Sequence, residues 1–177
     1  MAWSSICCPK EVGGLGVRRL YDISMALVSK LGWLLYKRPA DLLVKALLVK
    51  YLKNQHLLNA KKKPGASWLW QGILKASVIL EKGLYFLIKG GAQVDVWKDP
   101  WLPFIPSFKP FTRVTDGLPP PNMMVFDSID QHLRLWKVDL IKDLFDASSS
   151  QAILATPLPS SQEEVEDIAM WRLSKKE

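Results

Sequence analysis

Cysteine and histidine are scarce in this 177-residue chain, which has two of each. Cys7 and Cys8 are adjacent, and sequence neighbours form a disulfide only with backbone distortion. A closed zinc site needs about four Cys or His ligands at recognisable spacing, whereas His56 and His132 each stand alone in their segments. We therefore expect free thiols, no thiol nucleophile, no metal site and no cofactor.

Long apolar runs are also missing. A membrane span needs roughly 18 to 20 apolar residues, and basic residues interrupt the most apolar stretch at positions 30, 37, 38, 45 and 50. The N-terminal residues lack the basic region and apolar run of a signal peptide. These features predict a soluble intracellular protein, in the nucleus or cytoplasm, that is not secreted.

Recognisable catalytic motifs are lacking as well. The Gly13-Gly14-Leu15-Gly16 run permits a tight turn, but it does not have the Gly-Lys-Ser/Thr ending of a phosphate-binding loop. The carboxylates nearest to a metal-binding pair are Asp95 and Asp99, and an Asp before a proline is a favoured turn starter. We expect Asp99 to begin a turn and predict no catalytic residue.

Charge is present in excess of one sign and is unevenly distributed. The chain has 24 basic and 17 acidic residues, a net charge of +7. Residues 1–98 carry 16 basic and 5 acidic residues, a net of +11, and residues 99–177 carry a net of −4. A region this basic favours polyanions, because each phosphate that is neutralised releases counterions. Lysines that merely solvate helix surfaces would give the same count.

Apolar periodicity predicts three helices in the basic region. One begins near Asp22 and ends before Pro39, and a second begins after Asp41. Ser67 is placed to cap a third helix, with Trp70, Ile73, Leu74 and Ser77 on one face. Gly83 stands where a helix-terminating glycine belongs.

The pattern changes after the third helix. Residues 85–88 and 92–97 read as two strands joined by the Lys89-Gly90-Gly91 turn, which predicts a β-hairpin. Prolines make the next segment extended, and short helices are expected around 125–133, 139–145 and 149–154. The fold class is thus α+β, mainly α. We expect a basic helical region with a hairpin at 1–103, a Pro-rich connector at 104–122 and an acidic region of short helices at 123–177.

Tryptophan is abundant, with eight residues. Aromatic side chains next to lysines, as at Tyr51/Lys53 and Trp97/Lys98, can stack on unpaired bases. At helical spacing, however, tryptophan is more often part of a core. If Trp3, Trp33, Trp68 and Trp70 were exposed, they would form an apolar patch that favours self-association.

Three strings carry a resemblance to a known family. The first is Trp3…Cys8-Pro9-Lys10-x-x-Gly13-Gly14-Leu15-Gly16, followed by Ala26-Leu27-x-x-Lys30-x-x-Trp33. The second is Ala66-Ser67-x-x-Trp70-x-x-Ile73-Leu74-Lys75, and the clearest is Ile88-x-x-Gly91…Val96-Trp97-x-Asp99-Pro100-Trp101-Leu102-Pro103. Their order resembles the segment that follows the polymerase domain in plant non-LTR (LINE-type) retrotransposon reverse transcriptases. The chain departs from that family at Lys89-Gly90, where a Gly-(Asn/Asp) pair is usual.

In that family the polymerase palm, with its Tyr-x-Asp-Asp metal-binding turn, lies upstream. A Cys/His zinc-binding module, often followed by a ribonuclease H domain, lies downstream. The resemblance therefore implies that this chain is a connector, whose acidic region leads towards the zinc-binding module. It implies structural roles for the motif residues, which are Gly13, Gly14, Gly16, Trp70, Gly83, Gly91, Trp97, Asp99, Pro100 and Trp101.

Together these observations predict a non-catalytic fragment derived from a retrotransposon RNA-directed DNA polymerase. Any binding of RNA or DNA is expected to be weak, non-specific and salt-dependent, with no membrane involved. The candidate binding residues are Lys37, Arg38, Lys45, Lys50, Lys53, Lys61, Lys62 and Lys63. The alternative is a domesticated protein–protein interaction module without a nucleic-acid role, in which these residues are only solvated.

Overall fold

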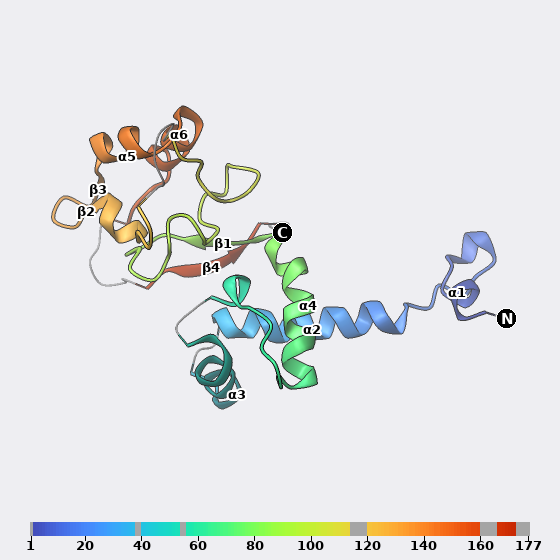
Figure 1. Cartoon of the computed structure of the whole chain (residues 1–177). Helices are drawn as coiled ribbons and strands as arrows, with labels where there is room; N and C mark the ends of the chain where they lie inside the picture. Colours follow the sequence, from blue (N-terminus) through green and yellow to red (C-terminus); the bar gives the residue numbers. More distant parts are fainter. Residues whose placement is uncertain (1, 38–39, 54–55, 114–119, 160–165, 173–177) are drawn as a thin grey trace. The chain divides into compact units, whose positions relative to one another are not determined.

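A computed structural model describes residues 2–37, 40–53, 56–113, 120–159 and 166–172 (Figure 1). Its contacts divide the chain into unit 1, Met1–Lys82, and unit 2, Gly83–Glu177. This division follows packing, whereas the boundary expected at residue 103 follows charge and composition. Among the described residues, no helix combines the length and the apolar character that crossing a bilayer requires.

Unit 1 is helical. Its two longest helices, α2 and α4, pack against each other, and α4 crosses α2 (Figure 1). Gly32 on α2 permits this packing, because a Cβ atom there would lie 3.0 Å from the Leu80 side chain of α4. The elements are α1 (Trp3–Ile6), the 3₁₀ turn η1 (Lys10–Val12), α2 (Leu20–Lys37), α3 (Leu42–Leu47), the π-helical turn η2 (Leu48–Leu52), the 3₁₀ turn η3 (Leu57–Asn59) and α4 (Trp68–Glu81).

The three helices predicted in this region are confirmed. Ser67 caps α4 as expected, since its hydroxyl oxygen accepts a hydrogen bond from the Trp70 N–H at 3.3 Å. Trp70 and Ile73 are buried, whereas Leu74 and Ser77, which were assigned to the same face, are only half-buried. The fully buried stripe continues instead through Ala76 and Leu80.

Unit 2 contains short elements joined by long loops. Strands β1 and β4 form one antiparallel sheet, with Leu84 opposite Trp171 and Leu87 opposite Ile168. Strands β2 and β3 form a second antiparallel pair. The elements are β1 (Leu84–Leu87), the 3₁₀ turn η4 (Val125–Ser128), β2 (Ile129–Asp130), β3 (Leu135–Trp136), α5 (Val138–Leu144), α6 (Ala147–Leu154) and β4 (Ile168–Trp171).

The β-hairpin predicted at 85–97 is wrong. β1 exists, but its strand partner is β4, and the Phe86 N–H donates to the Pro100 carbonyl at 2.8 Å. Residues 92–97 bond elsewhere, with the Val96 N–H donating to Met123 and the Val125 N–H to Val94, both at 2.9 Å. The turn carries the chain away from β1, and the two segments then pair with partners that are distant in sequence.

Gly83 directly follows the cap of α4, which is the position predicted for it, but its φ is not in the left-handed region that such a glycine usually adopts. A Cβ atom there would lie 3.0 Å from the indole of Trp171 on β4. Gly83 therefore makes room for a tryptophan ring of the neighbouring strand.

The fold class, α+β and mainly α, is confirmed. α5 and α6 lie where short helices were expected, at 139–145 and 149–154. The helix expected at 125–133 is limited to the 3₁₀ turn η4, because the chain continues from it as strand β2 and a turn. Within the described parts of the connector, 104–113 and 120–122, no helix occurs. The core of unit 2 gathers side chains from all of these segments, and the most deeply buried are Leu84, Ile88, Val94, Val96, Trp101, Leu102, Val125, Ile129, Ile141, Phe145 and Ile153.

Candidate functional site

The lysines predicted to bind nucleic acid lie on the surface of unit 1. Lys37 ends α2, Lys45 lies on α3, and Lys50 lies in η2. Lys53 follows η2, and the run 61–63 lies between η3 and α4. All seven of these lysines are exposed. Arg38, the eighth candidate, lies outside the described residues.

Tyr51 brings two of these lysines together. Its carbonyl oxygen accepts a hydrogen bond from the Lys63 ammonium at 2.9 Å, and the Lys50 ammonium lies 5.2 Å from the centre of its ring. Its hydroxyl lies 3.2 Å from both the hydroxyl and the backbone nitrogen of Ser67, the cap of α4. These bonds with Ser67, and to a smaller degree the Lys50 charge, lower the pKa of the Tyr51 hydroxyl. Tyr51 thus links η2, the lysine run at 61–63 and the start of α4.

The other lysines are placed by different contacts. The Lys37 ammonium lies 5.6 Å from the centre of the Trp33 ring, one helical turn earlier on α2. Lys53 has a φ of 44°, in the left-handed region, and its N–H closes the π-helical turn on Leu48. The structure therefore joins Lys50 and Lys63 through one residue, and it places Lys37 against another aromatic side chain.

Unit 1 as a whole is strongly basic. It carries 14 basic and 4 acidic residues, a net charge of +10, whereas unit 2 carries 10 basic and 13 acidic residues, a net of −3. A net charge of this size raises the local potential and attracts polyanions over a Debye length. The boundary between the two units, after Lys82, therefore separates a basic part from an acidic part about as sharply as a boundary after residue 98 does.

The two aromatic side chains expected to stack on bases are already engaged. Tyr51 is buried, and its ring stacks on Trp70 with centroids 4.5 Å apart. Trp97 is half-buried; its Nε1 donates to the Pro120 carbonyl at 3.1 Å and its ring packs on Phe145. The Tyr51 ring is therefore closed to a base, and the Trp97 ring is partly covered.

The sequence did not single out the aromatic residue that is most open in unit 1. Trp68 is 80% exposed, whereas Trp70, two positions later on α4, is 1% exposed. Two residues span about 200° of a helix, so the two side chains point in nearly opposite directions. This angular offset is the feature of the sequence that indicates that only one of the two tryptophans can face the core. Of the four tryptophans that would form an apolar patch if they were exposed, Trp3 and Trp68 are exposed, Trp33 is half-buried, and Trp70 is a core residue.

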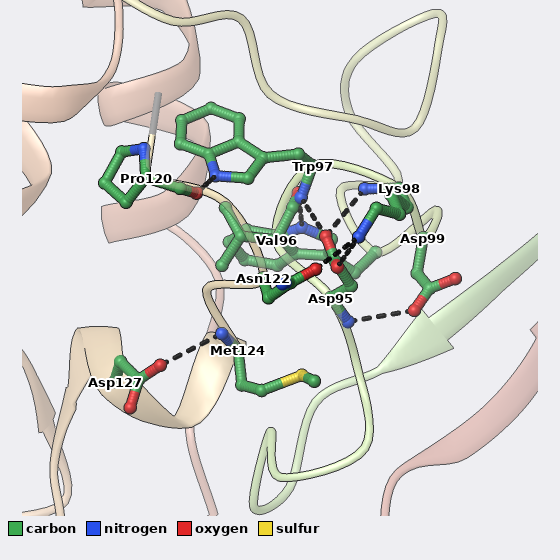
Figure 2. Close-up of polar contacts among 10 residues, drawn as sticks. Asp95, Val96, Trp97, Lys98, Asp99, Pro120, Asn122, Met124 and Asp127 are labelled. Atoms are coloured by element: carbon green, nitrogen blue, oxygen red, sulfur yellow. Dashed lines mark hydrogen bonds and ion pairs between the residues drawn. The ribbon is translucent and has the colours of Figure 1, made fainter. Parts of the chain in front are cut away.

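In unit 2, the motif around residue 97 forms a closed polar loop (Figure 2). The Asp95 carboxylate accepts the N–H groups of Trp97 at 2.9 Å and Lys98 at 3.0 Å, and forms an ion pair with the Lys98 ammonium at 2.8 Å. The Asp99 carboxylate accepts the Asp95 N–H at 2.8 Å. Both carboxylates are buried. They fold the loop by satisfying its backbone.

Neighbouring contacts anchor this loop to the rest of unit 2. The Lys98 ammonium also donates to the Asn122 side chain at 3.0 Å, as Figure 2 shows. The Trp101 indole donates to the Val96 carbonyl at 3.0 Å, and the Pro100 carbonyl bonds β1. In the described part of the chain, no group of three or more His, Cys, Asp or Glu side chains could hold a metal ion.

The glycine turn of the motif holds a carboxylate. Asp167, just before β4, accepts hydrogen bonds from the N–H groups of Lys89 at 2.8 Å, Gly90 at 3.1 Å and Gly91 at 2.9 Å. Successive N–H groups that converge in this way form an anion-binding nest. Gly91 has a φ of 73°, and a Cβ atom there would lie 2.6 Å from the Phe126 nitrogen. The guanidinium of Arg134 also bonds the Lys89 carbonyl.

The N-terminal glycines shape a turn next to α1. Gly13 and Gly16 have positive φ angles, 83° and 67°. Gly14 does not, but a Cβ atom there would lie 2.0 Å from the Cys8 carbonyl oxygen. Two of the three glycines thus use their conformational freedom, and the third permits a close approach of two backbone segments.

The chain is similar to two proteins of Arabidopsis thaliana. The protein named "Putative ribonuclease H protein At1g65750" is 31% identical over 118 residues, which is 65% of this chain and 18% of that protein. The protein named "Uncharacterized mitochondrial protein AtMg00310" is 30% identical over 103 residues, which is 58% of this chain and 67% of that protein. This chain thus spans less than a fifth of the first relative and two thirds of the second.

No family profile matches the chain. No solved structure matches it significantly.

Proposed function

The chain belongs to the family of the Arabidopsis mitochondrial protein AtMg00310, and from this premise we propose that it is a non-catalytic segment of a plant retrotransposon polyprotein that binds nucleic acid through unit 1. Two lines support the retrotransposon origin. One is the resemblance to the segment after the polymerase domain of LINE-type reverse transcriptases. The other is a relative named for ribonuclease H, because such a domain often lies downstream in that family.

The observation that carries the binding proposal is the basic surface of unit 1. Seven of the eight candidate residues are exposed lysines, and two of them converge at Tyr51. Lysine binds phosphate as a point charge without reading base edges, so the binding should be independent of sequence. Dissociation constants on the order of 10⁻⁶ to 10⁻⁴ M at physiological salt are typical of such binding.

The motif residues of unit 2 have structural roles in this proposal. Asp95 and Asp99 bond backbone N–H groups of their own loop, and Gly91 faces Asp167. These contacts explain why acidic residues and glycine are needed at those positions without any part in catalysis. The proposed binding activity therefore depends on unit 1.

The test is a fluorescence-anisotropy titration of a labelled oligonucleotide at several salt concentrations. We expect the logarithm of the affinity to fall linearly with the logarithm of the salt concentration. A K61Q/K62Q/K63Q variant should reduce the steepness of that slope by about 2, since each single-strand phosphate contact contributes about 0.7. The matched control, K109Q/K137Q/K142Q, removes the same charge from unit 2 and should leave the slope unchanged.

Two outcomes would contradict the proposal. One is the absence of binding to single- or double-stranded nucleic acid at low salt, and the other is an affinity that does not depend on salt. Association with a protein that survives nuclease treatment and high salt would support the alternative interaction module instead.

A further inference from the structure

The first half of α2 has an exposed apolar side. Leu20, Ile23 and Leu27 follow one another at intervals of three and four residues, so they form a stripe along one side of the helix, here called the outer stripe. Their side chains are 68%, 39% and 61% exposed. Leu31 and Leu34 lie on the same side further along and are half-buried. Figure 1 shows that the first half of α2 extends beyond α4, towards α1.

The outer stripe is separate from the side of α2 that packs in the core. Gly32, which packs against Leu80 of α4, follows Leu27 by five residues, or about 140° around the helix. The buried residues of α2 begin only at Ser29. A helix at the surface of a single unit needs one apolar side, and α2 has two, of which one is packed and one is open. Aligned apolar side chains that stay open mark a surface for a partner.

Basic side chains border the outer stripe. Lys30 follows Leu27 by three residues, and residues at this spacing are neighbours on a helix surface. Arg18 and Arg19, just before α2, line an open hollow of about 600 Å³ together with Ile23 of the stripe. Among the described residues, the two guanidinium groups and the Lys30 ammonium form no hydrogen bond and no ion pair. These cations are therefore available to a partner.

The acidic residue nearest to the stripe does not balance these charges. Asp22 also lines the hollow, and it is the single acidic residue of α2. It follows Leu20 by two residues, or about 200° around the helix, so it lies on the side away from the stripe. The border of the outer stripe thus has an excess of positive charge.

We propose that the outer stripe is a docking surface for an acidic amphipathic helix of a protein partner. The apolar side chains of that helix would cover the stripe, and its carboxylates would meet Arg18, Arg19 and Lys30. Charges beside an apolar seam select the partner helix in coiled coils in the same way. The inference goes beyond the proposed function and concerns other residues than the lysines at 37–63.

Composition and charge favour this occupant over nucleic acid and over a second copy of the chain. Residues 20–29 contain no lysine and no arginine, and depletion of lysine is typical of the cores of protein interfaces. Leucine and isoleucine offer neither a cation for phosphate nor an aromatic ring for a base. In an antiparallel pair of two α2 helices, the basic borders of the two copies would face each other and repel.

The experiment measures the binding of three labelled synthetic peptides to the full chain by fluorescence anisotropy at physiological salt. The first peptide is as long as α2 and has leucines at helical spacing bordered by glutamates. The second has lysines in place of the glutamates, and the third has the composition of the first in an order without an apolar stripe. We expect the first to bind about tenfold more tightly than the others, a difference that one buried leucine can supply.

Variants test the two parts of the surface. L27Q should weaken binding of the first peptide about tenfold, because a buried leucine contact is lost. L42Q is the matched control, since Leu42 begins α3, is 85% exposed and should leave the affinity unchanged. R18Q/R19Q should weaken binding about fivefold through the loss of two surface ion pairs. Because all these side chains are exposed, the melting temperatures should stay the same.

Failure of this inference can be told from failure of the proposed function. L27Q should leave nucleic-acid binding unchanged, and K61Q/K62Q/K63Q should leave peptide binding unchanged. The inference is overturned if the first peptide does not bind, if either of the other peptides binds equally well, or if L27Q is neutral. It is also overturned if L27Q dissociates a dimer in sedimentation measurements or abolishes binding to vesicles of anionic lipid, because a second copy or a membrane would then be the occupant.

Discussion

The two units of this chain use their charged side chains differently. In unit 1 the lysines lie on the outer surface of helices and turns, and its net charge is +10. In unit 2 many polar side chains bond backbone groups far along the chain. Asp167 bonds Gly91 across 76 residues, and Ser149 accepts the Phe111 N–H across 38. The difference follows from secondary structure.

A helix satisfies most of its own backbone groups, whereas a buried loop must find partners for its N–H and C=O groups. Unit 1 is built mainly from helices, so few of its charged side chains serve that purpose; Lys63, which donates to the Tyr51 carbonyl, is one that does. Unit 2 has long loops, and Asp95, Asp99 and Asp167 supply the missing acceptors. The exposed basic surface of unit 1 and the polar scaffold of unit 2 thus reflect two ways of satisfying backbone groups.

The largest effect is expected from Trp70→Ala. Trp70 is 1% exposed and stacks on Tyr51, so its removal should cost about 4 kcal/mol of stability through lost burial and a cavity. Chemical denaturation measures the loss, and hydrogen exchange should locate it in unit 1. Trp68→Ala on the same helix is the control and should cost less than about 0.5 kcal/mol. Equal losses for the two variants would contradict the assignment of core and surface.

Gly91→Ala should be almost as damaging, in the other unit. The new Cβ would lie 2.6 Å from the Phe126 nitrogen at a φ of 73°, so we expect a loss of about 3 kcal/mol, with faster hydrogen exchange in unit 2. Gly65→Ala is the matched control, because Gly65 has a φ of 72° but open space around it. That control should cost only about 1 kcal/mol. A similar cost at both positions would show that the close approach at Gly91 is unimportant.

Asp167→Ala tests whether the nest holds unit 2 together. Three backbone N–H groups lose their acceptor, and we expect a loss of about 2 kcal/mol in denaturation experiments. Asp167→Asn keeps a neutral oxygen and should lose about half as much. If both variants are as stable as the unchanged chain, the polar scaffold is not what stabilises unit 2.

Ser67→Ala removes a cap from unit 1. The hydroxyl accepts the Trp70 N–H and also bonds Tyr51, so we expect a loss of about 1 kcal/mol in thermal denaturation. Ser67→Asp is the comparison, since a carboxylate also caps a helix. It should recover most of the stability. Failure of the aspartate to do so would place the main effect in the Tyr51 contact.

The smallest effect is a pH dependence at Asp130. The N–H groups of Leu133 and His132 donate to its carboxylate and lower its pKa below the unfolded value of 3.8. A lowered folded pKa means that this stabilisation is present above the unfolded pKa and is lost as the pH falls through the folded one. Denaturation midpoints measured between about pH 5 and pH 2 should fall less steeply in Asp130→Asn. Identical profiles would contradict the assignment.

The helices of unit 1 depend mainly on neighbours in sequence and were predicted correctly. The helices beginning near Asp22, Asp41 and Ser67 follow from apolar spacing and capping residues, which act within one or two turns. The exposed lysines follow from the same spacing. Trp68 could have been recognised as exposed by its offset from Trp70, but it was grouped with the other tryptophans.

Features that depend on distant partners were not predictable in this way. Residues 84–87 have the composition of a strand, but nothing local indicates that β4, more than 80 residues later, is their partner. Likewise the turn at 89–91 is filled by Asp167, and Gly83 faces Trp171. In each of these three cases the local sequence pattern predicted the type of feature, a strand, a glycine turn or a helix-terminating glycine. It did not predict which distant residues contact that feature.

By itself, the sequence determined the helices of unit 1, its excess of positive charge and the resemblance to a retrotransposon family. Only the tertiary structure decided which lysines converge at Tyr51, which tryptophan stays open and which strand pairs with β1. Helix formation and charge are properties of short segments. Pairing and exposure depend on which distant segments meet, and many alternative pairings satisfy the same local pattern.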